Sequence, residues 1–343
     1  MKNTTTKSLS IWLSQLALVF TLVFTFVGCS DDAQPDTWQL VSEGQSGALL
    51  SVWGTSSTDV WTVGADARDG TGPLVLHYDG SAWQRIETGE TEGNLWWVHG
   101  FDQGPIFMGG DGGVILRYDN GVFTKMTTPD VGTVFGMWGA SPDAMWAVGS
   151  LTPTSGGFAW RLDGDTWTVE PGIPAAVTAD AALWKVNGRS ADDLYLVGSS
   201  GVALHWNGTA ISTVDTGTAT SLFTVHCSSD RVVAVGGLAT GSIVEYDGTS
   251  WQTTTPENAP GLTGVFIGPD DEGIAVGQYG AVYERTGGNW RPANMGFTLD
   301  QGFHATWIDP DGGVWAVGGQ TYATPMTDGM ILHRGAEVAT TGL

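Results

Sequence analysis

The sequence predicts an all-β fold, a seven-bladed β-propeller built from four-stranded antiparallel blades, and three observations lead to that prediction. A unit of two short β-rich runs recurs about every forty residues, which is the period of a repeat architecture. Turn-forming residues follow the unit at a constant place. The ordered part of the chain begins with a strand that has no neighbour in sequence, while the last repeat lacks its final strand. Together these features favour a closed ring of similar blades.

The repeat is clearest in residues 50–64, LSVWGTSSTDVWTVG, where two β-rich runs flank a small polar turn. β-Branched and aromatic residues dominate both runs, as they do in strands. The second run of each copy ends in glycine. The seven copies end at Gly64, Gly110, Gly149, Gly198, Gly236, Gly277 and Gly318.

Each repeat predicts four strands, which we name A to D in chain order. In the first repeat we expect them at Leu49–Trp53, Val60–Val63, Leu74–Tyr78 and Ala82–Ile86. Strands C and D are joined by residues that accept the positive φ of a hairpin turn. These C–D turns are Asp79-Gly80, Asp119-Asn120-Gly121, Asp163-Gly164, Asn207-Gly208, Asp247-Gly248 and Gly287-Gly288.

The two ends of the chain are expected to meet in the seventh blade. After the last C strand, Met330–His333, the chain ends without a tryptophan-bearing D strand. The segment Thr37–Val41 carries the Trp-Gln pair seen in other D strands, so we expect it to complete the blade and to remove an exposed strand edge. The predicted organisation is a signal peptide over 1–28, a lipidated cysteine and acidic linker over 29–36, the propeller over 37–335 and a C-terminal tail over 336–343.

The C–D turns resemble those of Asp-box or BNR-type propellers, through residues 79–83 (DGSAW), 163–167 (DGDTW) and 247–251 (DGTSW). A lipoprotein with a seven-bladed propeller of this kind is also similar to the photosystem II assembly-factor family. The Trp-Gly…Asp-Val-Trp-x-Val-Gly units are similar to those of repeat-rich secreted proteins of myxobacteria. These resemblances cover Trp38 to Arg334 and imply the propeller fold more than a function.

The N-terminal residues predict export and a membrane tether. Lys2 and Lys7 precede the apolar run Ile11–Val27, the arrangement of a secretory signal peptide. Residues 26–29 (FVGC) resemble a bacterial lipobox, in which Cys29 is lipidated and becomes the mature N-terminus. We therefore expect a lipid anchor in the bacterial cell envelope, outside the cytoplasm. The alternative is an uncleaved membrane anchor, because seventeen residues is at the lower limit for a spanning helix.

Charge and cysteine usage exclude several classes of function. The chain has 13 Lys+Arg against 36 Asp+Glu, which argues against nucleic acid as a partner. Lipidation of Cys29 leaves Cys227 without a disulfide partner. Cys227 stands where four other repeats carry glycine, so a small buried residue is favoured over a reactive nucleophile. The chain shows no cofactor motif and no cysteine-based zinc site, so we expect neither a cofactor nor a metal.

Candidate binding residues come from positions that break the repeat. Tryptophans shared by several blades are expected to pack the scaffold. The variable B–C and D–A loops lie at one end of a propeller, and variable loops on a rigid scaffold commonly carry recognition. Beside that end, Trp97 and Lys185 interrupt a strand-A column of small residues, and His304 is out of pattern. The candidate binding residues are Trp97, Lys185, His304, Arg68, Asp66, Glu90, Glu92, Asp300, Tyr322 and Asp328.

These features favour a non-enzymatic, membrane-tethered and monomeric interaction module that binds a protein or an extracellular glycan through the B–C/D–A loop face. The alternative is a sialidase-like glycosidase or a polysaccharide lyase, which would need clustered arginines and a pair of carboxyl groups. Of nine arginines, only Arg68 is expected on that face. A third hypothesis is calcium binding by the Asp-rich turns at 269–272 and 309–312, against the simpler one that these aspartates cap turns.

Overall fold

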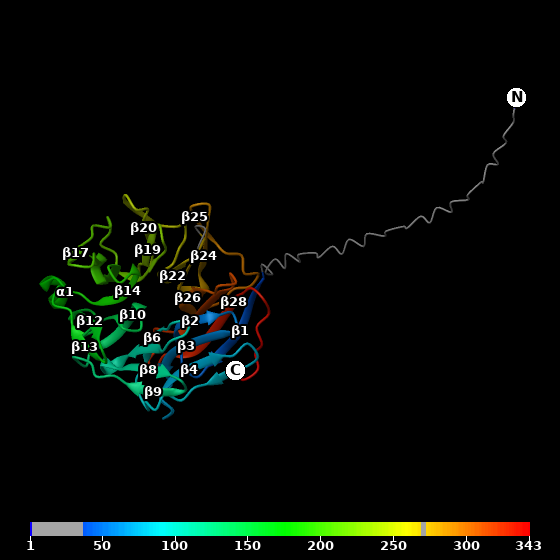
Figure 1. Ribbon diagram of the computed structural model, residues 1–343, viewed down its shortest axis with the longest axis horizontal. Coiled ribbons are helices and arrows are strands. Elements are labelled where there is room, and N and C mark those ends of the chain that lie inside the picture. Colours follow the sequence, from blue (N-terminus) through cyan, green and yellow to red (C-terminus); the bar gives the residue numbers. More distant parts are fainter. Residues whose placement is uncertain (2–36, 269–271) are drawn as a thin grey trace. The chain divides into compact units, whose positions relative to one another are not determined.

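The structure, a computed structural model, describes residue 1 and residues 37–268 and 272–343. Residues 37–343 form seven four-stranded antiparallel sheets arranged in a ring (Figure 1). The predicted seven-bladed β-propeller is therefore confirmed. The expected signal peptide, Cys29 and the acidic linker lie outside the described residues, so they stay predictions.

The first four blades follow the chain in order, with strands A to D of each blade side by side. Blade 1 has β2 (Leu49–Ser56), β3 (Asp59–Asp66), β4 (Pro73–Tyr78) and β5 (Trp83–Arg85). Blade 2 has β6 (Leu95–His99), β7 (Ile106–Gly110), β8 (Ile115–Asp119) and β9 (Val122–Lys125). Blade 3 has β10 (Thr133–Ser141), β11 (Ala144–Ser150), β12 (Gly157–Asp163) and β13 (Thr166–Val169). Blade 4 has β14 (Leu183–Ser190), β15 (Asp193–Gly198), β16 (Ala203–Trp206) and β17 (Ile211–Thr213).

The last three blades repeat this order, except that strand D of the seventh comes from the N-terminal end of the described domain. Blade 5 has β18 (Leu222–Cys227), β19 (Val232–Gly236), β20 (Ser242–Tyr246) and β21 (Trp251–Thr254). Blade 6 has β22 (Leu262–Ile267), β23 (Gly273–Gly277), β24 (Val282–Thr286) and β25 (Asn289–Pro292). Blade 7 has β26 (Gly302–Ile308), β27 (Val314–Gln320), β28 (Thr327–Arg334) and β1 (Trp38–Gln45). Short helical elements in the loops are α1 (Ala175–Asp180), η1 (Asp111–Gly113), η2 (Ser199–Gly201) and η4 (Gln278–Gly280).

Ring closure occurs as predicted, through pairing of β1 with β28. Trp38 lies opposite Arg334 and Leu40 opposite Leu332 in this antiparallel pair. The side chain of Trp38 is 9% exposed and that of Val41 is 4% exposed, so both join the core. The first described strand therefore completes the last blade and leaves no unpaired edge on β28.

The C-terminal tail fastens the closed blade to its neighbour. The Gln39 side chain donates a hydrogen bond to the Val338 carbonyl (3.0 Å) and accepts one from the Val338 amide (3.1 Å). Farther along, the backbone amide of Trp83 in blade 1 donates to the Thr341 carbonyl (2.8 Å). The indole of Trp83 donates to the Ala339 carbonyl (3.1 Å). Residues 338–341 thus link β1 to β5 across the junction.

Tryptophan and glycine residues at equivalent positions of the repeat form contacts between adjacent blades. A tryptophan near the end of strand A packs against a glycine at the end of strand A in the next blade. A Cβ added at Gly100 would lie 2.5 Å from the Trp53 ring, and one added at Gly54 would lie 2.8 Å from the Trp307 ring. Where strand A carries Asn187 instead, the next blade has Cys227, whose backbone amide donates to the Asn187 side chain (2.8 Å). Cys227 is buried, and burial raises its pKa, in agreement with a structural role.

Candidate functional site

The inner strand of every blade contains an irregularity at the same place, and it aims one side chain per blade at the centre of the ring. The register between strands A and B shifts by one residue near the start of each strand A. Such a bulge re-aims the extra residue. The residues at the seven shifts are Leu50, Trp96, Phe135, Trp184, Phe223, Thr263 and His304.

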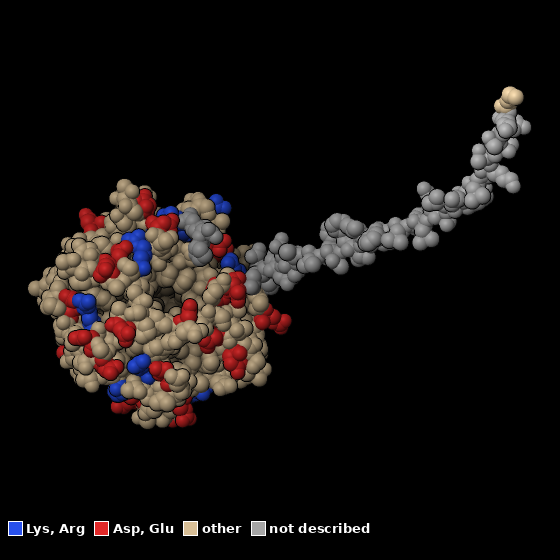
Figure 2. Space-filling view, viewed as in Figure 1, with Lys and Arg blue, Asp and Glu red and all other residues tan. Residues whose placement is uncertain are grey.

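Six of these seven residues line one cavity of about 290 Å³, which we call the channel pocket. The space-filling view shows the ring hollowed at its centre (Figure 2). Four aromatic rings dominate the wall, with Trp184 stacked on Phe223 (centroids 4.8 Å apart) and Trp96 edge-on to Phe135 (5.1 Å). The full lining is Trp96, Phe135, Trp184, Lys185, Phe223, Thr263, His304, Thr321 and Tyr322.

Lys185 brings a positive charge into this aromatic wall. Its side chain is only 4% exposed, and its ammonium donates a hydrogen bond to the Phe135 carbonyl (2.6 Å). The ammonium also lies over the Trp97 ring, 4.4 Å from its centroid, in a cation–π contact. No carboxylate of the described residues contacts it. Burial lowers the pKa of Lys185 to about 7.

Trp97 and Lys185, the two residues that interrupt the strand-A column, meet across the intervening blade. Trp97 belongs to blade 2 and Lys185 to blade 4, and blade 3 offers Gly136 between them. A Cβ at Gly136 would lie 2.7 Å from the Trp184 carbonyl oxygen and 2.9 Å from the Lys185 Cα. The Trp97 indole donates to the Met137 carbonyl (2.7 Å). Trp97 therefore supports Lys185 from behind and does not line the pocket itself.

His304 is the second nitrogen-bearing side chain of the channel pocket. Its Nδ1 donates to the Leu50 carbonyl (2.6 Å), because a carbonyl oxygen can only accept. Burial, together with the positive charge of Lys185, lowers the pKa of His304 to about 3. The ring is thus neutral at pH 7 and its Nε2 is an acceptor.

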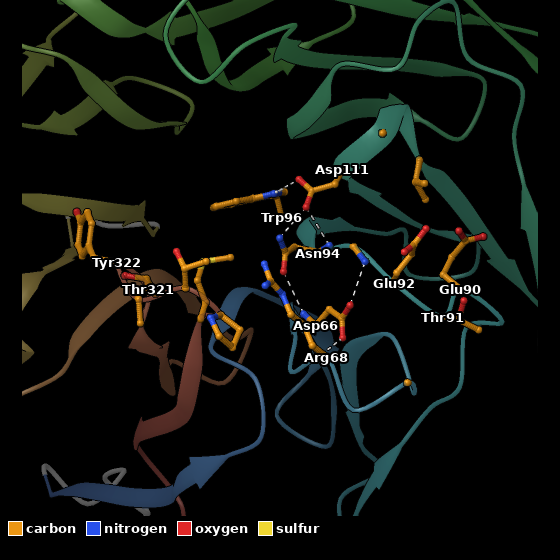
Figure 3. Close-up of a pocket in the computed structure, with 18 of the residues that line it drawn as sticks. Asp66, Arg68, Glu90, Thr91, Glu92, Asn94, Trp96, Asp111, Thr321 and Tyr322 are labelled. Atoms are coloured by element: carbon orange, nitrogen blue, oxygen red, sulfur yellow. Dashed lines mark hydrogen bonds between the residues drawn. The ribbon is translucent and has the colours of Figure 1, made fainter.

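A larger groove of about 1030 Å³ lies beside the channel pocket, between loops of blades 1, 2 and 7 (Figure 3). Five predicted residues line it, and they come from both predicted loop classes. These residues are Asp66, Arg68, Glu90, Glu92 and Tyr322. Thr321 and Tyr322 line both cavities, so the B–C loop of blade 7 forms their common border.

The carboxylates at the base of this groove hold its loops in place. Asp66 accepts hydrogen bonds from the backbone amides of Arg68 (2.6 Å) and Gly93 (3.2 Å). Asp111, which the sequence analysis does not select, accepts from the Asn94 side chain (2.6 Å) and the Trp96 indole (2.8 Å). These bonds are drawn in Figure 3. Both side chains are therefore engaged in building the site.

Charged groups on the groove rim differ in how far they are paired. Glu90 forms an ion pair with Lys125, with Oε2 2.8 Å from Nζ. Arg68 has a positive φ (61°), which non-glycine residues seldom adopt. The hydrogen bond from its backbone amide to the Asp66 carboxylate holds this conformation. Its guanidinium has no hydrogen-bond or ion-pair partner among the described residues. Glu92 is exposed.

The remaining two candidates lie apart from the groove. Asp300 lines a smaller cavity of about 360 Å³ together with Tyr279 and Tyr322, on the same face. Asp328, expected at the end of a loop, lies inside β28 and lines neither the groove nor the channel pocket. Blade 7 resumes pairing at Thr327, which shortens the loop.

Large apolar side chains exposed on the described surface concentrate on this same loop face. Leu151, Leu238, Tyr279 and Tyr322 lie in B–C loops, and Val131 and Phe297 lie in D–A loops. Tyr279 is 72% exposed and Tyr322 is 67% exposed. The others of this kind are Met1, Val122 and Val169. A face that collects exposed apolar side chains is typical of an interaction surface.

Sequence reasoning missed the four aromatic residues of the channel pocket. They share one strand-A column of the repeat with Leu50 and Thr263. The sequence contains a signal for them. At one position of strand A most blades carry a large apolar residue, and at the next position most carry a small one, which indicates that the two side chains point in different directions. Only the register shift shows that this column faces the channel.

Within residues 37–268 and 272–343, no group of histidine, cysteine and acidic side chains has the arrangement of a metal site. In the same part of the chain, no helix is long and apolar enough to cross a membrane.

Comparison of the sequence with protein-family models and with curated proteins finds no match. Comparison of the fold with solved structures finds many matches. A streptogramin B lyase structure matches with a TM-score of 0.66 and 14% identity, covering 86% of this chain and 97% of that one. YCF48 bound to D1 peptide matches with a TM-score of 0.64 and 14% identity (89% and 98% covered). The WD40 propeller domain of Doa1 matches with a TM-score of 0.65 and 11% identity, covering 89% of this chain and 99% of that one. At these identities the likeness shows the β-propeller fold alone.

Proposed function

We propose that this protein is an interaction module that binds a protein partner through the B–C/D–A loop face. The observation that carries the proposal is the position of the exposed apolar side chains, six of which lie in the loops of this one face. Interfaces are built around such aromatic and aliphatic side chains, surrounded by a polar rim. Arg68 and Glu92 supply polar groups of that kind beside the groove.

The scaffold suits this role because it presents the loops rigidly. Closure of the ring, the tail and the tryptophan contacts between blades hold the strand ends in place. YCF48, which shares the fold, is seen bound to a peptide. We further propose, from the sequence, that a lipid on Cys29 holds the module at a membrane outside the cytoplasm.

An enzymatic function is the alternative, since a streptogramin B lyase has the same fold. The glycosidase hypothesis needs several arginines at one site, and the described groove contains Arg68 but no second arginine. Its aspartates Asp66 and Asp111 accept hydrogen bonds from the loops, which leaves them poorly placed to act on a bound sugar. The geometry therefore favours binding over glycoside hydrolysis.

Affinity capture from envelope extract tests the proposal, with the tethered chain as bait and two variants compared with the unmodified protein. Tyr279→Ser combined with Tyr322→Ser should abolish capture of a specific partner, since it removes two apolar anchors of the face. Val122→Ser is the matched control, because Val122 is 62% exposed but lies on β9, outside the loops of the face. Partner capture that survives the double tyrosine change, or is lost with Val122→Ser, would contradict the assignment of this face.

A further inference from the structure

The channel pocket has the size and wall of a site for one aromatic group. Its volume of about 290 Å³ is at the lower end of ligand-binding cavities, and a cavity of about half that volume accommodates benzene. Its wall is formed mainly by the rings of Trp96, Phe135, Trp184 and Phe223. Aromatic walls bind rings and flat apolar groups by stacking and edge-on contact.

The buried charge of Lys185 in this pocket has no carboxylate partner among the described residues. An ammonium has three N–H donors, and that of Lys185 uses one for the Phe135 carbonyl while it lies over the Trp97 ring. The chain has 36 carboxylates, but none of the described ones pairs with this buried amine. Burial of an unpaired ammonium destabilises a fold, and the lowered pKa of Lys185 reflects this. An anionic group entering the pocket would accept a hydrogen bond from one of the two remaining donors.

His304 adds a complementary requirement. Its Nδ1 is committed to the Leu50 carbonyl, so the neutral ring leaves Nε2 free to accept one hydrogen bond. A ligand with an N–H or O–H group near its anionic group would meet both nitrogens. The pocket therefore combines an apolar wall, one donor cation and one acceptor.

Access to the pocket comes from the loop face. Thr321 and Tyr322 line both the channel pocket and the larger groove, so a ligand can reach the amine past the B–C loop of blade 7. Tyr322 is 67% exposed and therefore lies at the entrance.

We propose that the channel pocket binds the carboxylate end of an acylated aromatic amino acid. The carboxylate pairs with Lys185, the adjacent amide N–H donates to His304 Nε2, and the side chain lies among the aromatic rings. The same chemistry is found in a free N-acyl amino acid and in the last residue of a polypeptide. This inference rests on the channel contacts and is independent of the proposed protein partner.

Quenching of tryptophan fluorescence and calorimetry with N-acetylphenylalanine test the site directly. N-acetylphenylalaninamide has the same ring and N–H but no charge, so we expect it to bind at least tenfold more weakly, the ratio that a charge-assisted hydrogen bond supplies. A peptide Ala-Ala-Ala-Phe with a free or amidated end is the second arm. Tighter binding of Ala-Ala-Ala-Phe with a free carboxylate than of N-acetylphenylalanine assigns the site to the C-terminal residues of polypeptides. Tighter binding of N-acetylphenylalanine assigns it to small molecules. Equal binding of acid and amide, or no binding of either acid, overturns the proposal.

Lys185→Met and Arg291→Met form a test variant and its control. Lys185→Met should lower the affinity for the acid to that of the amide. Arg291→Met, which removes an exposed cation from β25 outside both cavities, should leave the affinity unchanged. Replacing a buried cation by an apolar side chain of similar length commonly preserves the fold. If the variant fails to fold, the comparison of acid and amide on the unmodified protein still decides.

The pH dependence of the unmodified protein gives a further readout. Lys185, His304 and Tyr322 are the titratable groups that line the pocket. Since the pKa of unliganded Lys185 is about 7, the affinity for the acid should fall by about twentyfold between pH 6.5 and 8.5. The affinity for the amide should stay constant over the same range. An affinity for the acid that does not change with pH would contradict the pairing with Lys185.

Discussion

Removal of residues 37–41, which carry the first half of β1, should destabilise the whole propeller, although they stand at one end of the folded domain. The change compares a chain beginning at Ser42 with one beginning at Thr37. The shorter chain loses Trp38, Leu40 and Val41 from blade 7 and leaves the last residues of β28, 332–334, unpaired on that edge. It also loses Gln39 and with it the two hydrogen bonds to the C-terminal tail.

The size of the effect follows from burial. Trp38 is 9% exposed and Val41 is 4% exposed. Truncation of a buried tryptophan costs about 3–5 kcal/mol, and a buried valine contributes about 1.5–3 kcal/mol. The loss should therefore be at least about 5 kcal/mol, which is much of the stability of a typical domain.

Urea unfolding followed by circular dichroism measures this loss. The chain beginning at Thr37 lacks only residues 1–36 and serves as the control for truncation as such. We expect the chain beginning at Ser42 to unfold at a much lower urea concentration or to be unfolded without urea. Equal midpoints for the two chains would refute the argument that β1 closes the ring.

Three further predictions concern packing, pH and turn capping. Gly100→Ala should lower the free energy of unfolding by about 1–3 kcal/mol, because the added methyl group would lie 2.5 Å from the Trp53 ring. In urea unfolding, Trp53→Phe should restore part of the stability lost in Gly100→Ala. Additive effects of the two changes would contradict the contact. Buried histidines should make the fold acid-sensitive, because burial lowers their pKa and the unfolded chain alone binds protons below about pH 6.5. The pKa is about 4 for His99, His226 and His333 and about 3 for His304. Stability should therefore fall by at least about 3 kcal/mol from pH 7 to 5, and a urea midpoint unchanged over that range would argue against neutral burial. Asp309→Ala should lower the melting temperature, because Asp309 accepts bonds from the Gly313 amide and the Trp315 indole.

Repetition made the architecture predictable from the sequence. Seven copies of one unit, hairpin residues such as Asp79-Gly80 and the unmatched Trp38 segment were enough to predict the blade number and the closure. The reason is physical, since each copy repeats the same alternation and the same turn chemistry. A single repeat would have left the strand order undetermined.

The candidate site was predictable only in part. Comparison of the blades identified Lys185 as an unusual residue, and the structure places it in the channel pocket. The direction of each side chain depends on the register shift near Leu95 and its equivalents, which strand alternation cannot predict. For this reason Trp97, a candidate binding residue, lies behind Lys185, while Trp96 faces the pocket.

The role of some polar residues also needed three-dimensional neighbours. His77 lies on β4 of blade 1. Its Nε2 lies 2.7 Å from Asp59, and its ring stacks on Trp61 with centroids 4.1 Å apart. The hydrogen bond with His77 is the main cause that lowers the pKa of Asp59. Partners from different strands cannot be paired from spacing alone.

The most direct test of the central claim is photo-crosslinking in the cells that make the protein, with a benzophenone amino acid placed at single exposed positions. Positions Leu151, Leu238, Tyr279 and Tyr322 report on the loop face, and Val122 reports on a site outside it. We predict crosslinks to one and the same protein from the loop positions and none from Val122. Crosslinks from Val122 with none from the four loop positions would contradict the claim that this face binds the partner.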